Sequence, residues 1–320
     1  MDKTQQEIYD NLLLSVVFNL KDFPKKSGQE GTAYFIDENF VVKEIMGSQE
    51  GFFKYENFVS YCEEINGFRE QGYPVPKIYS WTMLPASMFK KIGNFSFDRY
   101  YILEERVKGK ELFSHRISES FEDCKDFCSE KEFSDAILSH EGELYKKIVE
   151  TYLQYFIDTN EQLEALPESV IEQLVLGDYH MMKNQKFGVV DMHNANIMFD
   201  GKKILMIDHS FTENFFANFP DEKIRAIVMK DMLRIISGNE RGLFCGAMNK
   251  RKWKDLEVLF SKHKQTASSV MKRFINVTNR VLKPVFKDDM DYANSRDFIK
   301  MVSSDEAEEK EMLDMLQKSF

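Results

Sequence analysis

The sequence has few of the residues that cross-link or stiffen a small fold. Its 320 residues include 4 Cys, 7 Pro and 15 Gly. So few thiols exclude a disulfide scaffold, and the low Pro and Gly content excludes a collagen-like or Pro-rich architecture. Long apolar runs are missing too, since Leu12–Phe18 is too short to span a bilayer and follows acidic residues. We expect a reduced, soluble, cytoplasmic protein with no targeting segment and no membrane partner.

Positive charge is also in short supply. The 43 Lys and Arg residues are outnumbered by 53 Asp and Glu residues, which gives a formal net charge of −10. A protein that binds duplex nucleic acid needs a basic face, so we expect no nucleic-acid partner. The acidic balance is compatible with a cationic substrate, although many acidic proteins share it.

The remaining composition is that of a folded globular protein. Hydrophobic residues make up 43% of the chain and charged residues 30%, with 28 Phe, 13 Tyr and 17 Met, which argues against disorder and predicts an aromatic core. A chain of this length corresponds to roughly two domains, and it is long enough to bury a core without cross-links.

The predicted secondary structure changes in kind partway along the chain. The first third reads as strands with helices, at residues 4–22, 28–45, 52–70, 77–81 and 100–103. After a polar, poorly periodic stretch at 110–146, helices dominate at 147–165 and 221–320. This change predicts an α+β fold with two lobes. We place the N-lobe at 1–104 and the C-lobe at 105–320.

One lysine lies on the apolar side of a predicted strand. Side chains alternate along a strand, so Lys43 shares a face with Val41 and Ile45. An unpaired buried ammonium is costly. Lys43 therefore needs an anionic partner, either a carboxylate or a bound phosphate, unless it lies on an edge strand and points to water.

A second group of polar residues surrounds a predicted hairpin. The Asp200-Gly201 pair is a signal for a two-residue turn, which would pair Ile197–Phe199 with Lys202–Ile204. The same fold-back would bring Asp208, at the end of the second strand, toward the residues that precede the first.

Those preceding residues are Asp191 and Asn196. A carboxylate and an amide oxygen are ligands that Mg²⁺ prefers, and Asp191, ahead of the metal ligands, is placed to receive a proton. The alternative is a turn-rich loop whose Asp and Asn side chains serve only as local caps.

These residues carry a resemblance to a known family. Asp191-x-His193-x-x-Asn196, followed by Ile207-Asp208, resembles the catalytic and metal loops of the protein-kinase-like superfamily. It is most similar to the aminoglycoside and choline phosphotransferase branch, whose loop reads Asp-x-His-x-x-Asn. Further segments follow in the family's order: Gly28–Tyr34 resembles the nucleotide-covering loop, Lys43 the phosphate-binding lysine, Gly72–Tyr79 the segment after the first-lobe helix, and Tyr101–Gly109 the hinge.

The resemblance implies a bilobal protein-kinase-like fold with a small β-rich N-lobe and a larger, mostly helical C-lobe. It also implies ATP and Mg²⁺ as cofactors. Lys43 would hold the α- and β-phosphates and Asp191 would orient or deprotonate the acceptor hydroxyl, while Asn196 and Asp208 would bind Mg²⁺. Gly31 would lie in the covering loop, and Glu105 in the hinge whose backbone holds adenine.

In this family a helix carboxylate pairs with the lysine, and three residues are candidates for it here. Glu56, Glu63 and Glu64 all fall in the helix predicted at 52–70. We favour Glu64, because its separation from Lys43 and from Pro74 is similar to that in kinases.

The sequence also departs from the family pattern. The covering loop has two glycines rather than three, and Val189 occupies the place of a structural histidine. Asp208 is followed by His209-Ser210 rather than Phe-Gly, and no Ala-Pro-Glu element comes after it. These points favour a small hydroxylated acceptor over a protein substrate. A nucleotide-binding pseudokinase and a protein-kinase-like enzyme are the alternatives.

The acceptor is expected to meet the C-lobe helices and the stretch 110–185. Acidic residues there suggest a cationic acceptor such as an aminosugar or amino alcohol: Glu119, Glu122 and Asp123. The sequence does not specify an oligomeric state.

Overall fold

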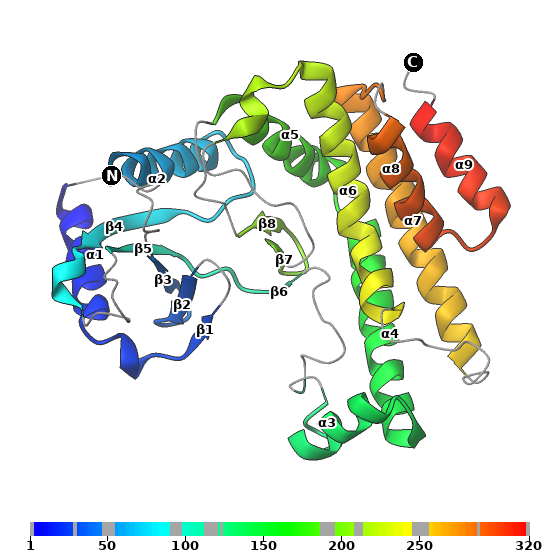
Figure 1. Cartoon of the computed structure of the whole chain (residues 1–320), viewed down its shortest axis with the longest axis horizontal. Helices are drawn as coiled ribbons and strands as arrows, with labels where there is room; N and C mark the ends of the chain where they lie inside the picture. Colours follow the sequence, from blue (N-terminus) through cyan, green and yellow to red (C-terminus); the bar gives the residue numbers. More distant parts are fainter. Residues whose placement is uncertain are drawn as a thin grey trace. The chain divides into compact units, whose positions relative to one another are not determined.

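The computed structural model of the chain (Figure 1) describes residues 3–27, 31–46, 55–89, 98–111, 121, 124–185, 196–207, 214–244, 256–286 and 289–317. The chain divides into two compact units. The first takes its described residues from 1–108, 180–191 and 205–217, and the second takes them from 109–179, 192–204 and 218–320.

The first unit is built on a five-stranded antiparallel sheet. Its strands are β1 (Lys25–Ser27), β2 (Gly31–Phe35), β3 (Phe40–Met46), β4 (Ile78–Leu84) and β5 (Arg99–Glu105), in the order β1-β2-β3-β5-β4. Helix α1 (Lys3–Val17) precedes the sheet, and helix α2 (Tyr55–Glu70) connects β3 to β4. In this order β3 and β5 are adjacent, β4 is at one edge and β1 is at the other.

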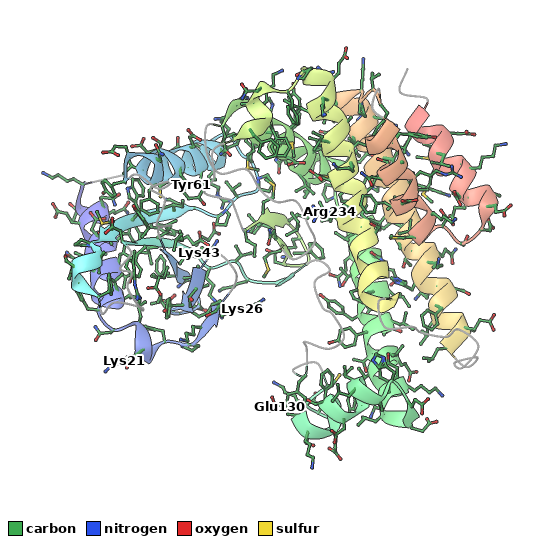
Figure 2. All side chains as sticks on the ribbon, in the orientation of Figure 1. Lys21, Lys26, Lys43, Tyr61, Glu130 and Arg234 are labelled. Atoms are coloured by element: carbon green, nitrogen blue, oxygen red, sulfur yellow. The ribbon has the colours of Figure 1, made fainter. Side chains whose placement is uncertain are left out.

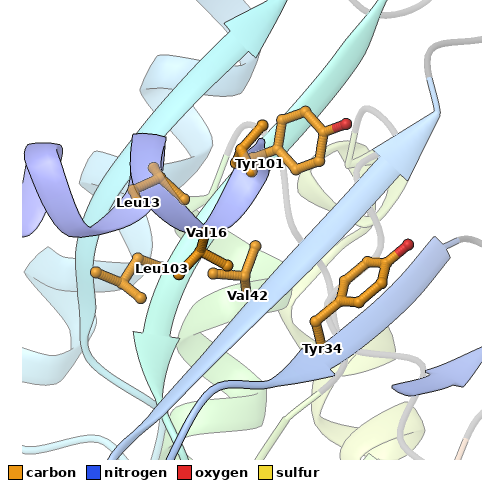
Figure 3. Packing of buried hydrophobic residues seen from close by; sticks show 7 residues of the cluster. Leu13, Val16, Tyr34, Val42, Tyr101 and Leu103 are labelled. Atoms are coloured by element: carbon orange, nitrogen blue, oxygen red, sulfur yellow. The ribbon is translucent and has the colours of Figure 1, made fainter. Parts of the chain in front are cut away.

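Each face of the sheet packs against one helix. Leu13, Val16 and Val17 of α1 are buried in one cluster with sheet residues of one face (Figure 3): Tyr34, Val42, Tyr101 and Leu103. The opposite face packs on α2, where the Phe58 ring lies 4.9 Å from the Tyr100 ring. The period-two alternation of β5 thus distributes Tyr100 and Tyr101 to different helices.

A buried carboxylate holds three donors beneath α1. Glu44 accepts hydrogen bonds from the Tyr34 hydroxyl at 2.8 Å, the Tyr101 hydroxyl at 3.1 Å and the Arg99 Nη1 at 2.6 Å. Burial, together with the hydrogen bond to Glu44, raises the pKa of Tyr34 to about 12. Because the charge is matched by Arg99 and both oxygens are hydrogen-bonded, Glu44 is tolerated in the core.

An irregularity in β4 is repaired by α2. The pairing of β4 with β5 shifts between Ile78 and Ser80. The Asn66 carboxamide donates to the Ile78 carbonyl and accepts from the Ile78 amide, both at 2.9 Å. This side chain therefore supplies both hydrogen bonds that a neighbouring strand would otherwise make.

The second unit is mostly helical. It contains α3 (Glu130–Ser139), α4 (Gly142–Glu164), α6 (Asp221–Phe244), α7 (Glu257–Leu282), α8 (Asp289–Val302) and α9 (Glu306–Gln317). Helix α5 (Glu168–Asn184) contributes residues to both units. Polar side chains of α7 bind its neighbours: the Arg273 guanidinium donates to the Leu163 carbonyl at 3.0 Å, and Arg280 bridges Glu168 and Glu172 at 2.5 and 2.6 Å.

The predicted hairpin forms, but its turn is longer than expected. A three-stranded sheet has the order β6-β7-β8, with β6 at Lys110–Glu111, β7 at Ile197–Phe199 and β8 at Ile204–Met206. The two-residue turn and the pairing of Lys202–Ile204 were therefore wrong. The Asp200 carboxylate accepts from the amides of Lys202 and Lys203, each at 2.9 Å, so it stabilises a four-residue loop.

The expected fold class is confirmed. The chain is α+β, with the larger sheet in its N-terminal part and helices in its C-terminal part. Between β2 and β3, the Asp37 carboxylate accepts from the amides of Asn39 and Phe40 at 2.6 and 2.9 Å. The first helix is shorter than expected: α1 ends at Val17 and a 3₁₀ turn follows at Leu20–Asp22.

Two glycines of the first unit should respond oppositely to replacement by alanine. A Cβ on Gly31 would lie 2.2 Å from the Glu44 carbonyl oxygen, whereas a Cβ on Gly67, inside α2, would meet nothing within 4 Å. We expect Gly31→Ala to lower the free energy of unfolding by about 1–3 kcal/mol through overpacking. Gly67→Ala should raise it by about 1 kcal/mol through helix propensity. Urea unfolding of both variants measures this, and equal effects would contradict the strand packing.

Candidate nucleotide site

Lys43 lies on the middle strand of the larger sheet, and its ammonium contacts a carboxylate and a main-chain carbonyl. Its Nζ is 3.0 Å from the Glu104 Oε1 and donates to the Ile207 carbonyl oxygen at 2.5 Å. Figure 2 labels Lys43 on its strand within the first unit. The side chains of Lys43 and Glu104 are 21% and 7% exposed, so the ion pair is largely withdrawn from water.

The ion pair is a diagonal contact across two adjacent strands. Lys43 of β3 is directly opposite Ile102 of β5, and Glu104 follows two residues later on the same face. Diagonal neighbours of this kind are within reach of long side chains. The anionic partner that the apolar strand face required is therefore a carboxylate of the adjacent strand.

The cysteine beside this pair is buried in α2. Burial raises the pKa of the Cys62 thiol well above its ordinary value, and the carboxylates of Glu104 and Glu63 raise it further. Cys62 is 0% exposed, which fits the packing of α2 against the face that carries Lys43. A thiol in this environment stays protonated, so Cys62 is a packing residue rather than a nucleophile.

The three carboxylates proposed as helix partners of Lys43 differ in exposure. Glu56 and Glu63 are exposed on α2, while Glu64 is half-buried. Partial burial suits Glu64 best among the three, and its pairing with Lys43 remains a prediction. The carboxylate at 3.0 Å from the Lys43 ammonium is Glu104, a residue that the sequence analysis did not single out.

A signal for Glu104 was present in the sequence. Tyr100 and Ile102 share one face of the strand predicted at 100–103, and Glu104, one residue beyond that strand, continues the same face. Glu104 is thus a charged residue that follows an apolar face, as Lys43 is a charged residue on one. Two such residues of opposite charge on neighbouring strands predict each other as partners. The order of the strands, which the sequence pattern does not provide, is needed to make that match.

Gly31 and Glu105 have structural partners of their own. Gly31 opens β2 opposite Ile45, and the strand packing described above already requires a glycine there. Glu105 receives Arg69 at 3.1 Å, and its amide donates to the Lys77 carbonyl at 2.8 Å. The cofactor roles of both residues remain predictions.

Of the residues predicted in the catalytic and metal loops, some lie within the described ranges and others lie outside them. Asn196 is described: it is 9% exposed and directly precedes β7. Asp191 and Asp208 lie outside the described residues, as do Gly28, Val189, His193, Glu119, Glu122, Asp123 and Cys245. Ile207, whose carbonyl receives the Lys43 ammonium, is the residue before Asp208.

The cysteines, the possible metal ligands and the helix lengths of the described ranges do not indicate a further function. Cys62, Cys124 and Cys128 carry free thiols. No cluster of three or more His, Cys, Asp or Glu residues suited to a metal ion occurs in the described part of the chain. Among the helices in those same ranges, none has the length and apolar character needed to cross a membrane.

Comparisons with known proteins find similar solved structures but no family. No protein-family model matches the chain, and no curated protein does. Among solved structures, the chain is similar to the MAP kinase LmaMPK10 from Leishmania major, with 11% sequence identity and a TM-score of 0.32. The match covers 98% of this chain and 82% of that one. At this score the likeness carries no argument about the site.

Removal of the Lys43 ammonium should show how much the ion pair with Glu104 contributes to the free energy of unfolding. Lys43→Met leaves the buried Glu104 carboxylate without its cation, so we expect a loss of about 3 kcal/mol in the free energy of unfolding. Adding Glu104→Gln to Lys43→Met should restore at least half of that loss, because the stranded charge is gone. Denaturant unfolding of both single variants and of the double variant gives the coupling. Strictly additive losses would contradict a direct pair.

Proposed function

We propose that the protein is an ATP- and Mg²⁺-dependent phosphotransferase with a protein-kinase-like fold, which transfers the γ-phosphate to the hydroxyl of a small molecule. The observation that carries the proposal is the contact between the Lys43 ammonium and the Ile207 carbonyl. It brings the lysine of β3 next to the residue before Asp208, across 164 positions of sequence. A lysine and a metal-binding carboxylate are the parts that bind a triphosphate, and Asp208 is the residue proposed to supply the carboxylate.

The proposed roles divide the charge of the nucleotide among a few groups. Lys43 holds the α- and β-phosphates, Asn196 and Asp208 hold Mg²⁺, and Asp191 orients or deprotonates the acceptor hydroxyl. Amide and carboxylate oxygens suit Mg²⁺. Phosphoryl transfer asks the protein mostly for positioning and charge neutralisation, and this set of residues supplies both.

Glu104 keeps the lysine ready for the nucleotide. A buried ammonium without a partner costs several kcal/mol, and Lys43 has its carboxylate at 3.0 Å. The same ammonium group also donates to the Ile207 carbonyl. We propose that the phosphates approach the same ammonium group.

The position of the adenine follows from the main chain after β5. The Glu105 amide donates to the Lys77 carbonyl and the Arg106 amide to the Asn39 carbonyl, both at 2.8 Å. Both amides thus already donate to carbonyls of the first unit. We therefore propose that adenine hydrogen-bonds the backbone of 107–108 rather than the Glu105 amide.

The choice of a small acceptor rests on the sequence around Asp208. The residues His209-Ser210 and the missing Ala-Pro-Glu element set this chain apart from protein kinases. The acidic stretch with Glu119, Glu122 and Asp123 favours a cationic acceptor such as an aminosugar or amino alcohol.

A second candidate is a nucleotide-binding pseudokinase. Two features favour it: Val189 in place of a histidine, and a steric reason for Gly31 in strand packing that needs no phosphate. Both candidates predict nucleotide binding, and they differ in whether acceptor-dependent ADP is formed.

Substitutions of the two aspartates separate chemistry from binding. Asp191→Ala should lower kcat by about 10²-fold or more, as expected for loss of a general base, while nucleotide binding stays within about threefold of wild type. Asp208→Ala should lose the Mg²⁺-dependent part of nucleotide binding. ADP formation with a panel of hydroxylated amines and with protein substrates, and thermal-shift titration with ATP and Mg²⁺, measure these effects.

The matched control is Asp200→Ala, which removes a carboxylate from the hairpin loop outside the proposed site. It should keep turnover. Wild-type activity in both Asp191→Ala and Asp208→Ala would overturn the proposed function. Nucleotide binding without ADP formation from any acceptor would favour the pseudokinase.

A further inference from the structure

An aspartate is buried in the second unit with nothing to stabilise its charge. Asp178 of α5 is 1% exposed, and neither of its carboxyl oxygens has a hydrogen-bond partner among the described residues. Leu174 and Val175, one turn earlier on the helix, are both fully buried. An ionised carboxylate removed from water needs a cation or several donors, whereas a neutral carboxyl is far less costly to bury. The surroundings of Asp178 therefore favour its protonated form.

A second carboxyl group acts on Asp178 from helix α6. Asp231 is 7% exposed. Burial, and then the negative charge of Asp231, raises the pKa of the Asp178 carboxyl well above its usual range. The two helices also meet at the next residue, since the Tyr179 hydroxyl donates to the Asp221 carboxylate and the Arg225 guanidinium is 6.0 Å from the Tyr179 ring centre. Two carboxyl groups that repel each other in a protein interior do not both ionise readily.

The charged groups of α6 favour the ionised form at Asp231. Lys230 directly precedes Asp231, and Arg234 follows it by three residues; Figure 2 labels Arg234 on its helix. Opposite charges three residues apart on a helix attract each other. A cation of the same helix thus supports a negative charge on Asp231, which leaves Asp178 as the group that carries the proton.

The charged groups of α5 and α7 do not supply a comparable cation to Asp178. Arg280 of α7 bridges the first turns of α5 at Glu168 and Glu172, at least six residues before Asp178. On α5 itself, His180 lies two residues later, on the other side of the helix. Burial, and then the nearby charge of Lys183, lowers the pKa of His180, so its ring is neutral near pH 7.

We infer that Asp178 and Asp231 form a buried acid pair that binds one proton at neutral pH, with the proton on Asp178. Removal of this proton leaves two negative charges in the interior of the second unit. The unfolded chain loses the proton above about pH 4, the ordinary range of an aspartate, whereas the folded protein keeps it. Stability therefore falls as the pH rises, until Asp178 ionises in the folded protein as well. The pair takes no part in the proposed phosphoryl transfer.

The pH dependence of unfolding gives the first test. Asp178→Asn keeps the shape of the side chain and removes its titration. The unfolding constant of the wild type divided by that of Asp178→Asn should rise about tenfold per pH unit between pH 5 and pH 7, as expected when unfolding releases one proton. Urea unfolding at each pH measures this ratio, and a ratio that stays constant with pH would overturn the inference.

The matched control is Asp158→Asn, which changes an exposed aspartate of α4 in the same unit. An exposed carboxylate is ionised in both the folded and the unfolded protein over this range. The corresponding ratio for Asp158→Asn should therefore stay within about twofold. A tenfold rise per pH unit with Asp158→Asn as well would show that the effect is not specific to Asp178, and would also overturn the inference.

Carboxyl carbon NMR of protein labelled with ¹³C-aspartate detects the proton directly. One aspartate of the wild type should remain protonated at pH 7, and its signal should be missing from Asp178→Asn. If that variant fails to fold, the titration of the wild type decides. In Asp231→Asn the same signal should titrate at lower pH, because one repelling charge is gone.

Two spectroscopic results would contradict the acid pair. An unchanged titration of the protonated signal in Asp231→Asn would show that Asp231 does not act on Asp178. Ionised carboxyls throughout the wild type at pH 7 would show that no proton is bound. If dialysis against EDTA then lowers the melting temperature, a metal ion neutralises the pair in place of the proton.

Discussion

The contact between Lys43 and Glu104 is the constraint on which the proposed site depends. A lysine on the inner face of a sheet is stable only with an anion beside it, and that anion comes from the neighbouring strand at 3.0 Å. The pair fixes where the ammonium can be, and so fixes which main-chain oxygen it can reach. That oxygen belongs to Ile207, at the end of a hairpin far along the chain.

The same two strands carry a second ion pair, in which β3 supplies the carboxylate and β5 supplies the cation. Glu44, next to Lys43, points to the other face and meets Arg99 of β5 at 2.6 Å. Lys43 is opposite Ile102 and pairs with Glu104, two residues later on β5. Glu44 is opposite Tyr101 and pairs with Arg99, two residues earlier on β5. A slip of one residue would turn each charged side chain to the wrong face. Together the two pairs fix the register of β3 against β5, the strands that carry Lys43 and Glu104.

Sequence reasoning reached the fold class and the need of Lys43 for an anion, but it did not single out Glu104. Alternation along Phe40–Ile45 placed Lys43 on an apolar face and required an anion, because both follow from local geometry. The identity of Glu104 depends on β5 lying next to β3, which is a long-range property that no local pattern encodes. The hairpin turn was misjudged because the Asp200 carboxylate binds two later amides, and this favours a longer loop than the Asp-Gly pair alone predicts.

The placement of Asn214 was beyond local pattern as well. An asparagine between Glu213 and Phe215 has no feature that separates it from a surface loop residue. Its hydrogen bonds to the carbonyls of Met181, Met182 and Gln185 appear only when the end of α5 is folded against it. Asp191 and Asp208, in contrast, stand out through spacing, and they remain predictions because they lie outside the described residues.

The environment of Cys62 has a consequence for how such a site could be controlled. Oxidation to a sulfenic acid and alkylation by electrophilic drugs both begin with an accessible thiolate. The Cys62 thiol of α2, beside the Lys43–Glu104 pair, is buried, and its raised pKa favours the protonated form. Peroxide and cysteine-directed inhibitors are therefore not expected to modify Cys62 while the first unit is folded.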